Sequence, residues 1–181
     1  MKRAILLPAD VTGAALAELK QWLGISSTNE DAQLTGLLHA SLDMCEGFTG
    51  QMPIEASCVE FHSLSRDWFE LDTRPVRAIT ALELVATDGT RSALASSDHE
   101  IDIEADGTGR ARLVTSQTGR YLVVSFAAGI AADWTSLPDA LRHGIIRLAA
   151  HNYRDRDAKE PLGPPASVAA LWHPWRRLRL A

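Results

Sequence analysis

Histidine and carboxylate side chains, which can bind metals or move protons, are scattered along this chain. His62 and His99 each lack a second histidine at a spacing that would let two imidazoles share a metal. His143 and His151 are eight residues apart, about two helical turns, whereas paired ligands on one helix are usually four residues apart. The histidines therefore predict no metal site.

Acids alternate with apolar side chains between residues 98 and 106. Glu100 and Asp102 alternate with Ile101 and Ile103, a pattern typical of a half-exposed strand whose carboxylates face water. A calcium loop would instead need its oxygen ligands in a compact turn with a fixed glycine. We therefore expect a strand here and no cation site.

None of the short motifs that mark nucleophiles or phosphate-binding loops occurs. The chain has no Gly-x-Ser-x-Gly, no Gly-x-x-x-x-Gly-Lys-Ser/Thr and no Gly-x-Gly-x-x-Gly opening a helix. The segment Asp106-Gly107-Thr108-Gly109 has two glycines, but it lies in a predicted hairpin rather than at a strand-to-helix turn. We therefore predict no catalytic, cofactor-binding or metal-binding residue, no cofactor and no enzyme activity.

Length and composition are those of an ordinary globular protein. The 181 residues are 46% hydrophobic and 23% charged, enough for one domain with an inserted subdomain. Cys45 and Cys58 form no Cys-x-x-Cys pair, so buried free thiols are expected. The chain start has no apolar run of signal-peptide length, and no stretch approaches the ~18 apolar residues of a membrane span. We expect a chain made in the cytoplasm, with no membrane partner.

The net charge of −5 conceals an uneven distribution. Residues 1–141 carry 20 acids and 10 bases, whereas residues 142–181 carry 3 acids and 8 bases. Opposed charges of this kind favour contacts between subunits or an electrostatic docking site, and the alternative is a solvated helix face and tail. The basic residues predicted to form a subunit interface are Arg142, Arg147, Arg154 and Arg156.

Apolar spacing predicts two helices near the start and one near the end. Thr12 is the expected N-cap of the first helix and Gly24 its end, and a second helix follows from about residue 29 to residues 47–50. Ser136 is the expected N-cap of the third helix. Between them, short alternating runs separated by Asp88-Gly89 and Asp106-Gly107 predict antiparallel hairpins.

The predicted fold class is α+β. It comprises a small helical bundle, made of two N-terminal helices and a long C-terminal helix, with an inserted antiparallel β subdomain and an extended C-terminal tail. The expected boundaries are 1–55 for the helical hairpin, 56–132 for the β subdomain, 133–160 for the third helix and 161–181 for a proline-rich linker and docking tail.

The tail combines tryptophan with arginine. The residues predicted to dock on a partner are Leu171, Trp172, Trp175, Arg176, Arg177 and Arg179. Trp and Arg are enriched in protein–protein hot spots, and the acidic remainder of the chain would repel a polyanion. Partner docking is thus preferred, and a nucleic-acid-binding accessory to DNA packaging is the alternative. Deleting residues 161–181 is expected to leave a folded protein that has lost its partner.

A series of short segments resembles the head-to-tail connector (adaptor) proteins of tailed bacteriophages and gene transfer agents. The segments that carry the resemblance are Phe48-Thr49-Gly50, Arg74-Pro75-Val76, Ala128-Gly129, Leu137-Pro138-Asp139-Ala140-Leu141, Asn152-Tyr153-Arg154 and Pro174-Trp175-Arg176. They span nearly the whole chain in the family's order. The chain departs from the family at Gln21-Trp22-Leu23, where His-Leu-Arg is expected, and at Trp175, where the family has Tyr before Arg.

The resemblance implies a homo-oligomeric ring, commonly twelve-fold, beneath the portal protein of a phage-like particle. Double-stranded DNA would pass through its channel without sequence-specific binding, and a tail-completion or stopper protein would attach below. The chain would then move from the bacterial cytoplasm, where particles assemble, to the head–tail junction. Acidic residues of one subunit would meet the basic helix face of the next.

Overall fold

The structure is a computed structural model that describes residues 3–155 and 163–177. Its fold is α+β with antiparallel sheets. The chain divides into two compact units. The β unit comprises residues 1–8 and 55–129, and the helical unit comprises residues 9–54 and 130–181. Each unit is built from segments distant in sequence.

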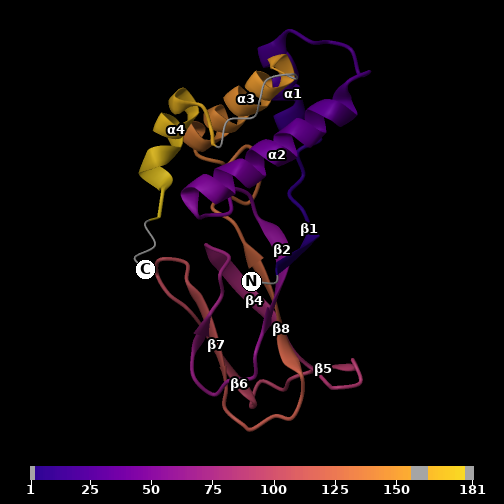
Figure 1. Cartoon of the computed structure of the whole chain (residues 1–181), viewed down its shortest axis with the longest axis vertical. Coiled ribbons are helices and arrows are strands. Elements are labelled where there is room, and N and C mark those ends of the chain that lie inside the picture. Colours follow the sequence, from indigo (N-terminus) through magenta and orange to yellow (C-terminus); the bar gives the residue numbers. More distant parts are fainter. Residues whose placement is uncertain (1–2, 156–162, 178–181) are drawn as a thin grey trace. The chain divides into compact units, whose positions relative to one another are not determined.

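A five-stranded sheet forms the larger part of the β unit (Figure 1). Its order is β1 (Arg3–Leu7), β2 (Ala56–His62), β8 (Tyr121–Ala128), β4 (Val76–Val85) and β5 (Arg91–Ala93), with antiparallel neighbours throughout. Strand β8 is central, and Leu122, Val123 and Val124 on it are fully buried. A continuous apolar run is typical of a strand covered on both faces.

A three-stranded sheet completes the β unit. Its order is β3 (Phe69–Glu70), β7 (Gly109–Leu113) and β6 (His99–Ile103). The predicted hairpins are confirmed, because β4 pairs with β5 across Asp88-Gly89 and β6 pairs with β7 across Asp106-Gly107. Both glycines have positive φ, which these tight turns require. The acid-rich segment is strand β6, as its alternation predicted.

Four α-helices share one core in the helical unit: α1 (Ala14–Leu23), α2 (Asp31–Thr49), α3 (Asp139–Arg154) and α4 (Ala166–Trp172), followed by a 3-10 turn, η1 (His173–Trp175). Leu19, Leu34, Leu38, Leu141 and Ile145 are fully buried in it. Gly24 and Gly50 end α1 and α2 in the left-handed conformation, where a Cβ is disfavoured. No helix in residues 3–155 or 163–177 is long and apolar enough to cross a membrane.

The predicted N-caps were wrong. Helix α1 has Gly13 as N-cap, and Thr12 instead donates its hydroxyl to Asp10 at 2.7 Å. Helix α3 has Pro138 as N-cap, and the backbone N–H of Ser136 donates to the Asp133 carboxylate. In both places a nearby aspartate organises a local turn that competes with capping.

The N-terminal segment also differs from its predicted place. Residues 1–55 were grouped as a helical hairpin, but β1 lies in the five-stranded sheet, where Ile5 is paired with Cys58. A strand of five residues, mostly apolar, has no period of its own that distinguishes it from a helix start. Its conformation is decided by a partner strand more than fifty residues away.

Candidate docking site

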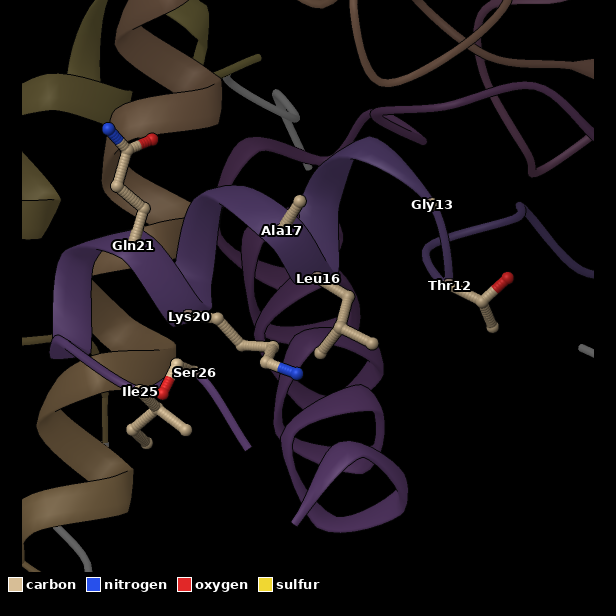
Figure 2. A pocket seen from close by; sticks show the side chains of 8 residues that line it. All are labelled: Thr12, Gly13, Leu16, Ala17, Lys20, Gln21, Ile25 and Ser26. Carbon is tan, nitrogen blue, oxygen red and sulfur yellow. The ribbon is translucent and has the colours of Figure 1, made fainter. Parts of the chain in front are cut away.

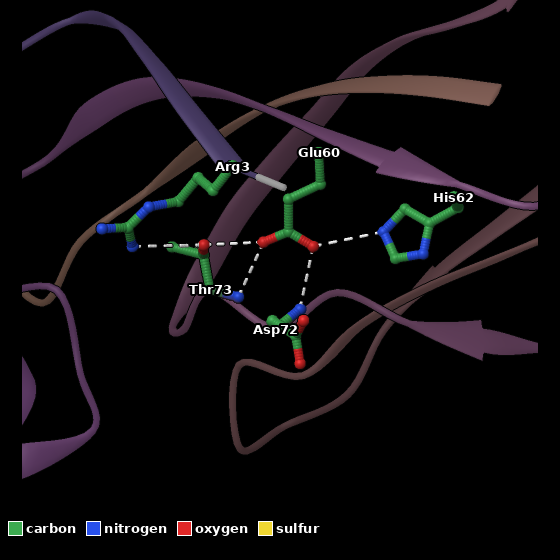
Figure 3. A network of polar contacts seen from close by, with 5 residues as sticks. All are labelled: Arg3, Glu60, His62, Asp72 and Thr73. Carbon is green, nitrogen blue, oxygen red and sulfur yellow. Dashed lines mark hydrogen bonds and ion pairs between the residues drawn. The ribbon is translucent and has the colours of Figure 1, made fainter. Parts of the chain in front are cut away.

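The polar network around Glu60 is the most buried charged site in the described chain, and its role is structural (Figure 3). The Glu60 carboxylate, only 2% exposed, accepts hydrogen bonds from Thr73 N at 2.9 Å, Thr73 Oγ1 at 2.7 Å and Asp72 N at 3.0 Å. His62 Nε2 lies 3.2 Å from Glu60 Oε2, the carboxylate oxygen that also accepts from Asp72 N. The network ties the loop after β3 to strand β2.

The protonation of Glu60 follows from this network. Burial raises its pKa, but the hydrogen bonds from His62, Thr73 and Asp72 outweigh burial and lower the pKa to about 2. The group is therefore a permanently charged acceptor near neutral pH and not a proton donor. No cluster of histidine, cysteine and acids within residues 3–155 and 163–177 could hold a metal ion.

A shallow pocket of about 400 Å³ lies along α1 (Figure 2). Lys20 is its only charged lining residue, and its ammonium group is 2.6 Å from Asp31. The other lining residues are Thr12, Gly13, Leu16, Ala17, Gln21, Ile25 and Ser26. With its single charge already paired, this pocket has no group placed for catalysis.

Trp172 attaches the C-terminal segment to the helical core. Its ring is fully buried, and the centre of the ring lies 6.0 Å from the centre of the Phe48 ring. The ring Nε1–H donates a hydrogen bond to the Leu141 carbonyl oxygen at 3.3 Å. A Cβ on Gly144 would stand 2.2 Å from Trp172 Nε1, so only glycine leaves room for the ring. Trp172 was predicted to be an anchor for a partner, and the structure places it inside its own chain instead.

The segment after Trp172 lies against the end of α2. The Trp175 carbonyl accepts a hydrogen bond from Gln51 Nε2 at 2.6 Å, and the Arg177 N–H donates to Thr49 O at 2.9 Å. Trp175 is half-buried, and Arg176 is exposed with its guanidinium carbon 5.5 Å from the centre of the Phe48 ring. One hydrogen bond from the Gln51 side chain and one between backbone groups thus hold the backbone of residues 175–177 in place, and Arg176 stays exposed.

The other predicted docking residues differ in accessibility. Leu171 is half-buried and packs against the helical core, and the Arg177 side chain is half-buried. Arg179 lies outside the described residues. The sequence predicted that deleting residues 161–181 would leave a folded protein. In the structure this deletion would remove Val168 and Trp172 from the core, so we expect it to destabilise the helical unit.

The basic residues of α3 fall into two groups. Arg142 is engaged within its own chain, because its guanidinium group lies 2.8 Å from Asp139 and 3.7 Å from Glu18. Arg147 and Arg154 form no ion pair with any residue of the described chain, and they are seven residues apart, on one side of the helix. Arg156 lies outside the described residues.

One sequence signal for the burial of Trp172 was available. Val168 and Trp172 are four residues apart, which places both on one side of a helix, and Gly144 on α3 permits close approach. The signal is weak because tryptophan next to arginine is equally typical of an exposed binding segment. Glu60 gave no sequence signal, because an acid in a strand usually faces water.

No family model and no curated protein matches the chain. Solved structures do. One is a chain from a structure of the neck of an empty gene transfer agent (GTA) particle, which was computed with C6 symmetry. It has a TM-score of 0.81 and 24% sequence identity, and the match covers 100% of this chain and 98% of the GTA chain. A chain in the neck of a native GTA particle, computed with C12 symmetry, has a TM-score of 0.77 at 28% identity with the same coverage.

The resemblance predicted from the sequence is confirmed. A chain of the virion of a native GTA particle is also similar, with a TM-score of 0.76, 27% identity and coverage of 100% and 98%. These GTA neck and virion chains match both units and not one alone, since the coverage of this chain is complete. The likeness includes the strand at the N-terminus and the helical segment at the C-terminus.

Proposed function

We propose that this chain is a structural subunit of the neck of a phage-like particle, where it acts as a head–tail connector. The observation that carries this proposal is the likeness to GTA neck chains along the entire length, with a TM-score of up to 0.81 and 98% of the other chain covered. The alternative, a DNA-binding packaging accessory, is not favoured by these neighbours.

The connector forms a homo-oligomeric ring between the portal and the tail. Support comes from the necks of the similar chains, which were computed with C6 and C12 symmetry. Cyclic assemblies place two different surfaces of each subunit in contact, so the ring closes by rotation. DNA passes through its channel without sequence-specific contacts, and a tail-completion protein binds on the side away from the portal. Subunits assemble in the bacterial cytoplasm and end in the particle neck.

The surface that docks on the portal is formed by Trp175, Arg176 and Arg177, with Leu171 at its margin. Trp172 does not belong to this surface. Its buried ring attaches α4, the helix that precedes the surface, to the helical core. The exposed guanidinium of Arg176, held over the Phe48 ring, is presented with little side-chain freedom left to lose on binding. A preorganised cation of this kind suits an acidic partner surface.

The test is to measure binding of Arg176→Glu to the portal protein encoded in the same gene cluster. Arg120→Glu is a matched control, because Arg120 is also exposed and also lies over an aromatic ring, 5.8 Å from the centre of Tyr121. We expect Arg176→Glu to weaken binding at least about tenfold, equivalent to about 1.4 kcal/mol, and Arg120→Glu to bind like the unchanged chain. Equal binding by both variants would contradict the docking assignment.

Electron microscopy of the purified chain, alone and mixed with that portal, tests the ring. Rings that appear alone or on the portal support the connector role. A chain that forms no ring in either sample contradicts it.

A further inference from the structure

The last turn of α2 lies beside α4 and the segment that follows α4 (Figure 1). The centre of the Phe48 ring in this turn is 6.0 Å from the centre of the buried Trp172 ring, and 5.5 Å from the guanidinium carbon of Arg176. A single side chain of α2 therefore contacts both the residue that attaches α4 to the core and the exposed cation that is proposed to bind the portal.

Two hydrogen bonds extend this contact along the chain. Gln51 Nε2 donates to the Trp175 carbonyl oxygen at 2.6 Å, and the Arg177 N–H donates to the Thr49 carbonyl oxygen at 2.9 Å. The two bonded residues of the C-terminal segment are the immediate neighbours of Arg176 in the sequence. Arg176 is thus held on both sides by the end of α2, while its own side chain stays exposed.

The turn η1 is too short to fix this conformation by itself. It has three residues, and it ends at Arg176, whose backbone is extended with φ −72° and ψ 122°. The Arg176 N–H bonds to the His173 carbonyl at 3.1 Å, but the last carbonyls of a helical turn have no partner within the turn. The Trp175 carbonyl is one of these, and Gln51, 124 positions earlier, supplies its partner. The Gln51 amide therefore caps a turn that belongs to another element.

The backbone that carries Gln51 is fixed by its own hydrogen bonds. Gly50 ends α2 in the left-handed conformation, with its N–H bonded to the Glu46 carbonyl at 2.8 Å. The hydroxyl of Thr49, which is fully buried, donates to the Cys45 carbonyl at 2.7 Å and accepts the Gln51 N–H at 3.2 Å. The Gln51 side chain therefore projects from an ordered helix end, so the contact can order the C-terminal segment.

We infer that Gln51 is a positioning residue of the docking surface: its amide holds the Trp175 carbonyl, and this presents Arg176 in the conformation that binds an acidic partner surface. The inference rests on the proposed docking surface and adds to it a residue that acts through another. A surface that is already ordered loses less conformational freedom on binding. Removing the contact should therefore cost affinity although every side chain of the docking surface is retained.

Amide hydrogen exchange of the purified chain tests the contact without any partner. Gln51→Met keeps a side chain of similar length and removes its donor. We expect the Arg177 amide to exchange about fivefold faster in this variant, the ratio that corresponds to the loss of one typical hydrogen bond. The Gly50 amide, which is bonded within α2, should exchange as in the unchanged chain. An unchanged exchange rate at Arg177 would overturn the inference.

Portal binding shows whether the contact acts through Arg176. We expect Gln51→Met to weaken binding about fivefold, and to change it by no more than about twofold when Arg176→Ala is already present, because the group that Gln51 orients is then missing. Alanine is used here because it removes the charge without adding a repulsive one. A change that only loosened the fold would weaken binding by the same factor in both backgrounds, and that result would overturn the inference.

Thr80→Val is the matched control, since it also removes a side-chain hydrogen bond to a carbonyl, that of Ser125 at 3.0 Å from β4. It should leave both the Arg177 exchange rate and portal binding unchanged, and an equal effect of Thr80→Val would overturn the role given to Gln51. Normal binding by Arg176→Ala would overturn the docking assignment itself. The exchange rate at Arg177 needs no portal, so failure of the contact and failure of the docking assignment are told apart.

Discussion

At the scale of single residues, Glu60 is a buried charge whose solvation is replaced by hydrogen bonds. Its pKa of about 2 lies below the usual value of 4.5, so its contribution to stability is complete above the pKa of the unfolded chain and declines as the pH falls toward 2. Loss of this charge would leave the N–H groups of Asp72 and Thr73 facing a weaker acceptor.

We predict that Glu60→Gln lowers the free energy of unfolding at pH 7 by about 2–3 kcal/mol, because an amide offers only one acceptor oxygen to these donors. The variant should also lose the part of the decline in stability below pH 4.5 that the titration of Glu60 contributes. Urea unfolding across this pH range provides the measurement. Glu70→Gln is the control, since Glu70 is exposed and its ion pair with Arg74 contributes at most about 1 kcal/mol; an equal effect of both changes would refute the prediction.

At the scale of elements, the attachment of α4 to α3 depends on the space above Gly144. We predict that Gly144→Ala lowers the free energy of unfolding by about 1–3 kcal/mol, because its methyl group overlaps the Trp172 ring. Gly47→Ala is the matched control within α2, where a Cβ meets nothing within 4 Å. There the change should stabilise the chain by up to about 1 kcal/mol through its helix propensity.

Thermal or urea unfolding of the two glycine variants distinguishes these outcomes by sign. If Gly144→Ala were as stable as Gly47→Ala, Trp172 would not occupy the position described for it. The portal-binding surface of residues 175–177 would then lack its buried support.

At the scale of the whole molecule, basic residues are concentrated in residues 142–181, and only some of them form ion pairs with acids of the same chain. Arg147 and Arg154 form no ion pair among the described residues, whereas Arg142 is bound to Glu18 and Asp139. We predict that Arg147→Gln combined with Arg154→Gln weakens association between copies about tenfold at low salt. Each arginine would lose one ion pair with an acid of the neighbouring copy, and such a pair contributes up to about 1 kcal/mol. The difference should shrink as salt rises, because exposed charges are screened.

Sedimentation equilibrium at two salt concentrations checks this prediction, under conditions where the unchanged chain associates. Arg142→Gln removes the same charge from the same helix and should leave association unchanged. If Arg142→Gln weakened association as much as the double variant, the effect would reflect overall charge rather than an interface at Arg147 and Arg154.

Features decided by neighbouring residues could be read from the sequence. Gly24 and Gly50 end helices, Asp88-Gly89 and Asp106-Gly107 make hairpins, and the alternation in β6 makes a strand, because each depends on backbone preferences within a few residues. The α+β class follows from the succession of such signals. The order of short segments along the chain was also sufficient to predict the resemblance to connector proteins.

Tertiary structure decided what distant residues do to one another. Strand β1 exists because β2 pairs with it, and Trp172 is buried because Leu141 and Gly144, about thirty positions earlier, accept its ring. Arg142 pairs with Asp139, three positions earlier, at 2.8 Å, and with Glu18 from another helix at 3.7 Å, and only the second contact depends on the folded chain. Among the candidate docking residues, only packing of the folded chain separates the buried Trp172 from the exposed Arg176. Local patterns specify conformation, but burial and pairing depend on which segments meet.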